Sequence, residues 1–370
     1  MDQRPPRVGV VVTGLDVLSA SGRGPDALSA AVFSGTAAFA PVTRFDTAHR
    51  TVRDAAQLPG GPELGEELLR VIGAALRASG LAGGAAQQTP VLLALHADAR
   101  TRALATHVGC VYEVENVYTC ACVAASTAVA DAATRISLGR SERIVVAAGY
   151  LVEPDTFAVF DAGRALARDG RARPFSPGRG GLLLGDAVAA VVLEAEPAAR
   201  DRGAPVLARI PGWARTGDAY HVCRPAPDGS GLGRAIGGAL QRAGLRPEQL
   251  GYVNANATGA PLADGAETAA LRDALGAHLG GVPVSSTKSV HGHALEASAL
   301  LELIVSILAV RDGRLPVNAG YLGAEESDES AERQLNLVLD PGRPTTSSYA
   351  LSLNSAFGGA NTALLVEAVS

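Results

Sequence analysis

The chain has 370 residues, 47% of them hydrophobic, so it is long enough to bury a large core. Its net charge of -5 and the lack of any run of Lys or Arg argue against nucleic-acid binding through bulk charge. The longest apolar stretch, residues 295–310, is interrupted by Glu296 and Glu302 and is too short to span a bilayer. The first six residues lack the apolar core of a signal peptide, so we expect a cytoplasmic protein without membrane segments.

Hydrophobic patterning predicts strands and helices that follow one another along the chain. Runs of β-branched and small apolar residues indicate strands over residues 8–14, 91–95, 144–148, 187–193, 251–255, 350–354 and 363–369. Apolar residues at helical spacing indicate helices over residues 62–79, 123–138, 230–243 and 295–310. Ser230 fits an N-cap, and Gly139 and Gly244 fit helix ends. This alternation predicts a layered α/β fold.

The number and spacing of the cysteines argue against a disulfide framework and against a zinc site. Four cysteines in a chain of this length do not make a disulfide framework. Cys120 and Cys122 are too close in sequence for a relaxed bridge, and with Cys110 and Cys223 they lack zinc-ligand spacing. We therefore expect reduced thiols and no metal or other cofactor.

Cys120 and Cys122 stand where an Ala-rich helix is predicted to begin. A thiol at the positive end of a helix is favoured as thiolate, and the small residues around it would admit an acyl chain. Two small buried hydrophobic residues would give the same pattern, because free cysteine is often part of a core. The segment by itself leaves both interpretations open.

Three further segments combine polar side chains with turn residues. Asn256 follows the strand 251–255, where its amide suits either a hydrogen bond to a thioester carbonyl or a simple turn. Residues 285–293 carry Lys288, His291 and His293 just before the apolar helix, which suits acid, base or oxyanion chemistry or a helix-capping loop. The Gly pair in residues 354–361 permits a ligand to approach the backbone, or forms an ordinary tight turn.

Taken together, these segments resemble the β-ketoacyl-carrier-protein synthases of the two-histidine type, in the thiolase superfamily. The resemblance runs almost end to end and is carried by residues 10–15, the Arg-Pro-Phe stretch 173–181, residues 185–187, 217–221, 316–318 and 354–361. It implies the thiolase fold, a five-layered α-β-α-β-α arrangement with two pseudo-equivalent halves. We place these halves at residues 1–200, with the nucleophilic cysteine, and 201–370, with the Asn, His and Lys. The duplication itself is not visible in the residues.

The resemblance also implies roles for single residues. Cys122 matches the acyl-accepting nucleophile, since its distance to Gly139 fits the family's nucleophilic helix better than that of Cys120. His293 matches the histidine of the Gly-His motif, and Lys288, five residues earlier, matches the family's lysine. Glu267 matches the acid that pairs with that lysine. In the turn that corresponds to the family's Gly-Phe-Gly-Gly, Phe357 matches the gating aromatic residue before Gly358. The N–H groups of Cys122 and Phe357 would form the oxyanion hole.

Two departures from the family pattern affect the expected chemistry. Asn256 occupies the position of the first catalytic histidine, which in the family assists malonyl decarboxylation, and an amide carries no proton or positive charge. The order Cys, Asn, His is similar to that of thiolases, but these also need a second cysteine that residues 356–359 do not offer. Only a short segment separates the strand 91–95 from Cys122, where the family has a longer insertion, so we expect an altered acyl pocket or dimer contact.

The resemblance implies a ketosynthase-like acyltransferase of polyketide-type or fatty-acid-type specialised metabolism. It would take an acyl group from acyl-carrier protein or acyl-CoA onto Cys122 and condense it with a malonyl-type extender. Two alternatives remain open: a non-decarboxylating acyltransferase that uses an amine, alcohol or thiol acceptor, and a non-catalytic partner of the chain-length-factor type. A homodimer or a heterodimer with a ketosynthase-type subunit is expected, without nucleic-acid or membrane partners.

Overall fold

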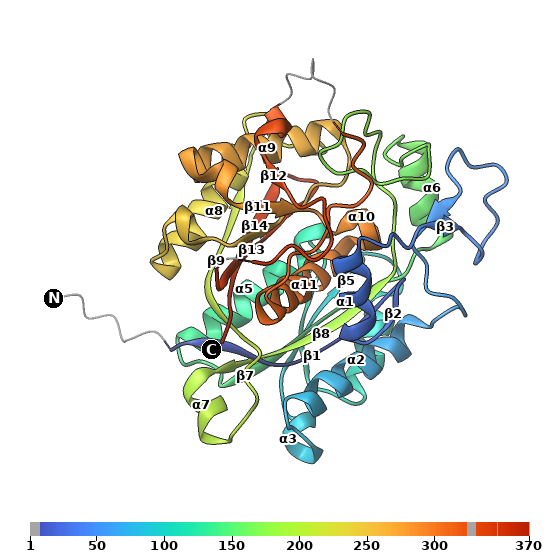
Figure 1. The fold of residues 1–370 in the computed structure, drawn as a ribbon. Helices are drawn as coiled ribbons and strands as arrows, with labels where there is room; N and C mark the ends of the chain where they lie inside the picture. The colour runs from blue at the N-terminus through green and yellow to red at the C-terminus, as the bar shows by residue number, and fades with distance from the viewer. Residues whose placement is uncertain (1–7, 324–330, 346, 370) are drawn as a thin grey trace.

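A computed structural model describes residues 8–323, 331–345 and 347–369 of the chain (Figure 1). Among these residues, twelve strands form one large mixed sheet, in the order β12-β11-β10-β13-β14-β9-β1-β8-β7-β5-β6 with β2 paired to β1. A small second sheet joins β3 (Ala40–Pro41) to β4 (Asp54–Ala55). The strands alternate with helices, which confirms the α/β fold class.

The first half of the chain contributes one end of the large sheet. Its strands are β1 (Val10–Ser19), β2 (Gly22–Arg23), β5 (Val91–Leu95), β6 (Val114–Tyr118), β7 (Arg143–Tyr150) and β8 (Ala187–Ala195). Its helices are α1 (Pro25–Ser34), α2 (Leu64–Ala78), α3 (Gly83–Gln87), α4 (Thr101–Gly109), η1 (Ala121–Val123), α5 (Ala124–Ser137), α6 (Pro154–Ala162) and α7 (Glu196–Asp201).

The second half contributes the other end. Its strands are β9 (Ala208–Gly217), β10 (Tyr252–Asn254), β11 (Pro283–Ser285), β12 (Asn336–Leu337), β13 (Tyr349–Ser355) and β14 (Ala360–Glu367). Its helices are α8 (Ser230–Ala243), η2 (Pro247–Gln249), α9 (Pro261–Leu275), η3 (Gly276–Gly281), α10 (Lys288–His291), η4 (Leu295–Ala297), α11 (Ser298–Asp312) and η5 (Ala331–Gln334).

The two halves repeat one strand pattern. The run β1-β8-β7-β5-β6 pairs antiparallel, antiparallel, parallel and parallel, and the run β9-β14-β13-β10-β11 repeats these four relations in the same order. The antiparallel pairing of β1 with β9 joins the two runs. This internal repetition, which the residues do not reveal, matches the two pseudo-equivalent halves of the thiolase fold.

The helices cover the strands in layers. Helices α5 and α11 contact each other, and each of them contacts strands of both runs, so they form the middle layer (Figure 1). Helix α2 packs on β1, β7 and β8 from one outer side, and α8 packs on β9 and β14 from the other, with α9 beside it. The result is the expected five-layered α-β-α-β-α arrangement.

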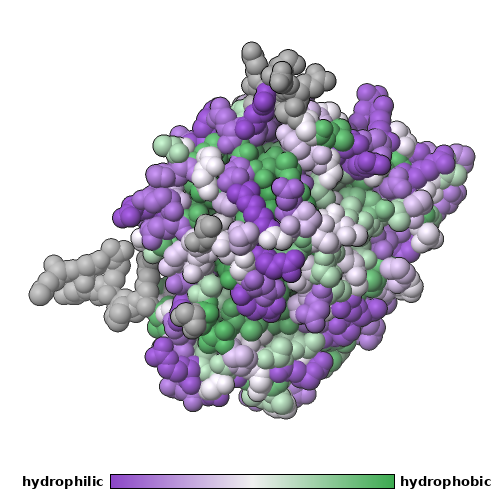
Figure 2. All heavy atoms as spheres, viewed as in Figure 1, coloured by the Kyte–Doolittle hydropathy of each residue, from purple (hydrophilic) through white to green (hydrophobic). Residues whose placement is uncertain are grey.

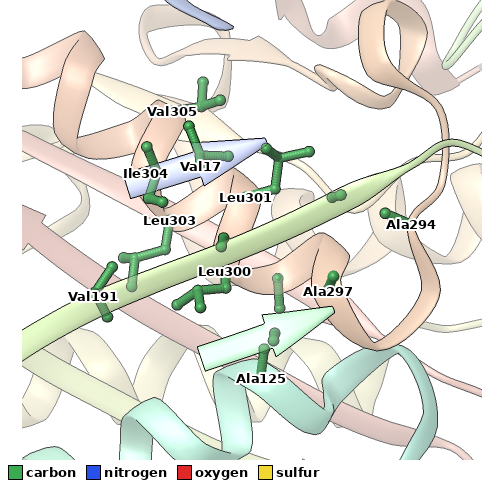
Figure 3. Close-up of a cluster of buried hydrophobic side chains, with 14 of the residues drawn as sticks. Val17, Ala125, Val191, Ala294, Ala297, Leu300, Leu301, Leu303, Ile304 and Val305 are labelled. Carbon is green, nitrogen blue, oxygen red and sulfur yellow. The ribbon is translucent and has the colours of Figure 1, made fainter. Parts of the chain in front are cut away.

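The core of the molecule lies around the middle layer. Figure 3 shows side chains of α11, including Leu300, Leu303 and Ile304, meeting Val17 of β1 and Val191 of β8. Every residue of α11 from Ser298 to Val310 is buried, as its all-round apolar sequence predicts. This rigid centre is where the N-termini of α5 and α11, with the predicted site residues, come together.

Local predictions agree with the structure to different degrees. The strand 91–95 and the helix 230–243 are observed with the predicted bounds, and Gly244 ends that helix in the left-handed region at a φ of 68°. The predicted N-cap Ser230 is wrong. Gly229 holds the N-cap position instead at a φ of 64°, because the bulk of a side chain there would meet Ala266 and Ala270 of α9.

The outer surface mixes polar and apolar side chains. The face in Figure 2 carries hydrophilic side chains around its rim and exposes hydrophobic ones between them. Within the described part of the chain, no helix combines the length and the hydrophobicity that a membrane span requires.

Candidate active site

The nucleophile candidate Cys122 lies between the edge strand β6 and helix α5. Ala121, at the start of η1, has a φ of 53°, which is uncommon for a residue other than glycine. The chain turns sharply here, so that Cys122 is buried at 8% exposure whereas Cys120 is exposed. The structure therefore distinguishes the two thiols, and η1 with Cys122 packs against η4, β13 and β14.

Burial decides the protonation of this thiol. It raises the pKa of Cys122 to about 12, the carboxylate of Glu296 adds to the rise, and the ammonium group of Lys288 opposes it. Burial therefore favours the neutral thiol of Cys122, in opposition to the thiolate that a position at the positive end of a helix favours.

His293 is held by backbone bonds on both sides. Its N–H donates to the carbonyl of Leu183 at 2.7 Å, and its own carbonyl accepts from the N–H of Gly185 at 3.0 Å. Gly185 has no room for a side chain, because a Cβ atom there would lie 2.0 Å from the carbonyl oxygen of His291. Gly185 therefore fixes the position of the loop that carries His293.

The hydrogen bonds of the two imidazoles separate their roles. Nδ1 of His293 accepts from the N–H of Leu295 at 2.9 Å, so Nε2 carries the hydrogen and is a donor. Burial and the nearby charge of Lys288 hold the pKa of His293 well below its ordinary value, so the ring is neutral. His291 contacts the carbonyl of Gly292 with Nδ1 and the hydroxyl of Thr287 with Nε2, so both of its nitrogens are used within the fold.

Asn256 follows β10 and faces the same region. Its N–H donates to Oε1 of Glu267 at 2.8 Å, and its Oδ1 accepts from Nζ of Lys288 at 3.2 Å. Because an ammonium group can only donate, Lys288 fixes the amide with Nδ2 turned away as a donor. Asn256 and His293 thus each carry a side-chain N–H group that no acceptor among the described residues engages.

Lys288 connects these residues but does not form the predicted ion pair. Its Nζ lies 2.6 Å from Oε1 of Glu302, and Asn354 donates to the other oxygen of that carboxylate at 2.6 Å. Glu267 was predicted to pair with Lys288, and this is wrong: Glu267 bonds the backbone of Asn256, and burial raises its pKa to about 8. Glu302 on the middle helix reaches the lysine, whereas Glu267 lies beyond ion-pair distance of it.

Two features of the printed sequence mark this pair. Lys288 is the only lysine among the 370 residues, although arginine is abundant. Glu302 is an acidic residue within an otherwise apolar buried helix, and such a residue requires a buried partner. Lys288, exposed by only 1%, is the partner that this rule would have suggested.

The turn between β13 and β14 lies at the surface of this region. Phe357 is 55% exposed, and its ring centroid lies 6.3 Å from that of Phe160 in α6. The N–H of Gly358 donates to the carbonyl of Val222 at 2.8 Å, so Gly358 shapes the turn and is not free to serve in an oxyanion hole. Among the described residues, no acceptor is found for the N–H of Phe357, which leaves it available for that role.

Glu296 is a site residue that sequence reasoning did not assign. It lies in η4, directly against η1, and is 3% exposed. Its Oε1 contacts Nδ1 of His96 at 3.0 Å, which raises the pKa of the His96 imidazole.

In the described ranges, no group of three His, Cys, Asp or Glu side chains is arranged to hold a metal ion.

Two family models match the chain in sequence order. The model described as "Beta-ketoacyl synthase, N-terminal domain" matches residues 114–199, and "Beta-ketoacyl synthase, C-terminal domain" matches residues 207–321. Together they cover more than half of the chain and contain Cys122, Asn256, Lys288 and His293.

Curated relatives and solved structures agree with these models. A 3-oxoacyl-[acyl-carrier-protein] synthase 2 of Synechocystis sp. is 34% identical over 66% of this chain and 59% of its own length. The same enzyme of Staphylococcus aureus is 33% identical over 67% of this chain and 61% of its own length. The chain thus spans about three fifths of these relatives.

The likeness in three dimensions extends over almost the whole chain. A β-ketoacyl synthase from Burkholderia phymatum is 25% identical, with a TM-score of 0.86 over 99% of this chain and 100% of that one. The ishigamide ketosynthase/chain length factor is 24% identical, with a TM-score of 0.88 over 98% of this chain and 100% of that one. These matches confirm the fold.

Proposed function

Because the chain belongs to the β-ketoacyl synthase family, we propose that it is a condensing enzyme that carries an acyl group on Cys122 as a thioester. One observation carries the proposal: η1 with Cys122 packs against η4, which begins two residues after His293, and the buried Lys288 of the same segment bonds Asn256. Residues from distant parts of the chain therefore lie near one thiol.

The first step is acyl transfer to the enzyme. The Cys122 sulfur attacks the carbonyl carbon of an acyl thioester, the bond to the donor thiol breaks, and the proton lost by Cys122 leaves with that thiol. The N–H groups of Cys122 and Phe357 would bind the oxyanion that forms. A buried neutral thiol is inert toward water-borne oxidants and reacts when a thioester is held against it.

The second step uses the two side-chain donors. Nε2–H of His293 and Nδ2–H of Asn256 are suited to stabilise the enolate that a malonyl-type extender forms when it loses carbon dioxide. The enolate carbon then attacks the acyl carbonyl carbon, the C–S bond to Cys122 breaks, and the released Cys122 thiolate takes up a proton from solvent. Both donors are neutral, so their bonds to an enolate are weaker than that of an imidazolium by about 1.5–3 kcal/mol, or one to two decades in rate.

A second candidate is transfer of the acyl group to an amine, alcohol or thiol without decarboxylation. It is favoured by the neutral Asn256 and by the carboxylate of Glu296, whose negative charge next to Cys122 opposes a malonyl carboxylate. The third possibility, a non-catalytic chain-length-factor-like subunit, is disfavoured by the complete set of Cys122, His293 and Lys288.

For partners, we propose an acyl-carrier protein or CoA as the acyl donor and a dimer as the working unit. Strand β6 ends the large sheet and, in the described structure, pairs only with β5, so its outer edge has room for a strand of a second chain. Because β6 leads directly into η1, such a dimer would close the site next to Cys122.

The experiment that tests the function follows acyl-loaded enzyme and malonyl-carrier protein by mass spectrometry. The proposal predicts a β-ketoacyl product together with loss of carbon dioxide. Transfer of the acyl group to a nucleophile, with no carbon dioxide released under any primer, would replace it with the second candidate. An enzyme that takes up no acyl group and binds a ketosynthase tightly would support the third.

A further inference from the structure

The carboxylate of Glu296 has one oxygen that the fold leaves unsatisfied. Oε1 is engaged by His96, whereas Oε2 is buried and has no hydrogen-bond partner among the described residues. The side chain as a whole is 3% exposed, so solvent does not supply the missing donor freely. A buried acceptor without a donor is destabilising, and more so when it is charged.

The contacts of Glu296 leave one carboxylate oxygen open. The side chain of His96, 38% exposed at the surface, contacts Oε1 of Glu296 and leaves Oε2 without a donor. The ring of Tyr150 packs at a steep angle to that of His96, with centroids 6.3 Å apart.

The position of Glu296 relates it to the nucleophile. It is the middle residue of η4, which packs directly against η1, of which Cys122 is the middle residue. Leu295, just before it, has a φ of 42°, so the backbone is held in a sparsely populated conformation to present this segment. Ala125, Leu295 and Ala297, in the elements that contact η1, belong to the same apolar core as Cys122.

We propose that Glu296 determines acyl specificity: its Oε2 accepts a hydrogen bond from an amino or hydroxyl group carried by the acyl chain on Cys122. This inference rests on the proposed function, because it requires an acyl group on Cys122. An ammonium or hydroxyl group satisfies the buried oxygen, an alkyl chain leaves it unpaired, and a carboxylate places two like charges together. We expect Cys122 to be acylated fastest by acyl chains that carry an amino or hydroxyl group, more slowly by plain alkyl chains, and slowest by chains that carry a carboxylate.

The test compares four pantetheine thioesters of similar size: 3-aminopropanoyl, 3-hydroxybutanoyl, butanoyl and succinyl. Initial rates of adduct formation on Cys122 are measured by intact mass. For the wild-type chain we expect the amino and hydroxy substrates to react about tenfold faster than butanoyl, which corresponds to about 1.4 kcal/mol, and succinyl to react slowest.

Variants assign the preference to one carboxylate. Glu296→Gln removes the charge with little change in size, and should bring the amino and butanoyl rates within about twofold and raise the succinyl rate. Glu248→Gln, the same change at an exposed position outside the site, should leave all four rates unchanged. His96→Gln keeps the charge of Glu296 and should retain the amino preference, even if Glu296→Gln proves unstable.

Equal rates for the four substrates in the wild-type chain would overturn the inference, as would an unchanged amino preference in folded Glu296→Gln. These outcomes leave the acylation of Cys122 intact. By contrast, the absence of an adduct with all four thioesters would remove the proposed function, and the inference with it.

Discussion

Removing the ammonium group of Lys288 should cost more stability than any surface charge. Lys288→Met leaves Glu302 buried with only the Asn354 bond, and an uncompensated buried charge of this kind costs about 3–5 kcal/mol. At about 2.1 cal/mol/K per residue, unfolding of 370 residues has an entropy near 0.8 kcal/mol/K, so the melting temperature should fall by about 4–6 °C.

The assay is calorimetry on Lys288→Met, Glu302→Gln and the double variant. Because the double variant contains neither charge, it should recover most of the loss, and the coupling between the two sites should exceed about 2 kcal/mol. Arg246→Met, which breaks the exposed pair with Glu248, serves as control and should leave the free energy of unfolding nearly unchanged. Losses that simply add in the double variant would refute a direct Lys288–Glu302 pair.

Three further predictions concern single residues of the site. Burial raises the pKa of Glu267 from 4.5 to about 8, so between these pH values the folded chain keeps a proton that the unfolded chain has released. The free energy of unfolding of the chain should therefore fall as pH rises from about 4.5 to 8, by up to about 1.4 kcal/mol per pH unit. Glu267→Gln should flatten this slope in urea titrations. Asn256→His should raise the rate of carbon dioxide release from malonyl-carrier protein by about 10-fold to 100-fold, and an unchanged rate would show that this position does not limit decarboxylation. Gly185→Ala should destabilise the chain by about 1–3 kcal/mol and slow acylation of Cys122, since the added Cβ would displace the loop that carries His293. Unchanged acylation in a folded variant would contradict the role of Gly185 in positioning that loop.

Much of the fold followed from local patterns, because its central elements are strongly apolar and bounded by clear turn residues. The strand 91–95 and the helix 230–243 are of this kind. Strand β6 was not predicted, since an edge strand with the exposed side chains of Glu115 and Asn116 lacks the pattern of a buried one. The internal repeat was expected only from the family resemblance, because it is a repeat of strand order and pairing and not of residues.

For the site, motif order predicted which residues belong together but not which of them touch. Glu267 and Glu302 both lie within the electrostatic reach of Lys288, and only packing decides that Glu302 makes the ion pair. Helix position alone suggested a reactive thiolate at Cys122, whereas the burial that raises its pKa depends on segments far away in the sequence. The open oxygen of Glu296 depends in the same way on His96, 200 residues earlier in the chain.

The most direct test of the account is an intact-mass measurement after incubation with acyl thioesters, followed by peptide mapping. We predict one acyl adduct per chain, located on Cys122, absent from Cys122→Ala and retained in Cys120→Ala, since Cys120 faces outward. An adduct that survives Cys122→Ala would contradict the assignment of Cys122 as the acyl carrier. The same holds if the wild-type chain stays unmodified by every acyl thioester while its exposed thiols react with iodoacetamide.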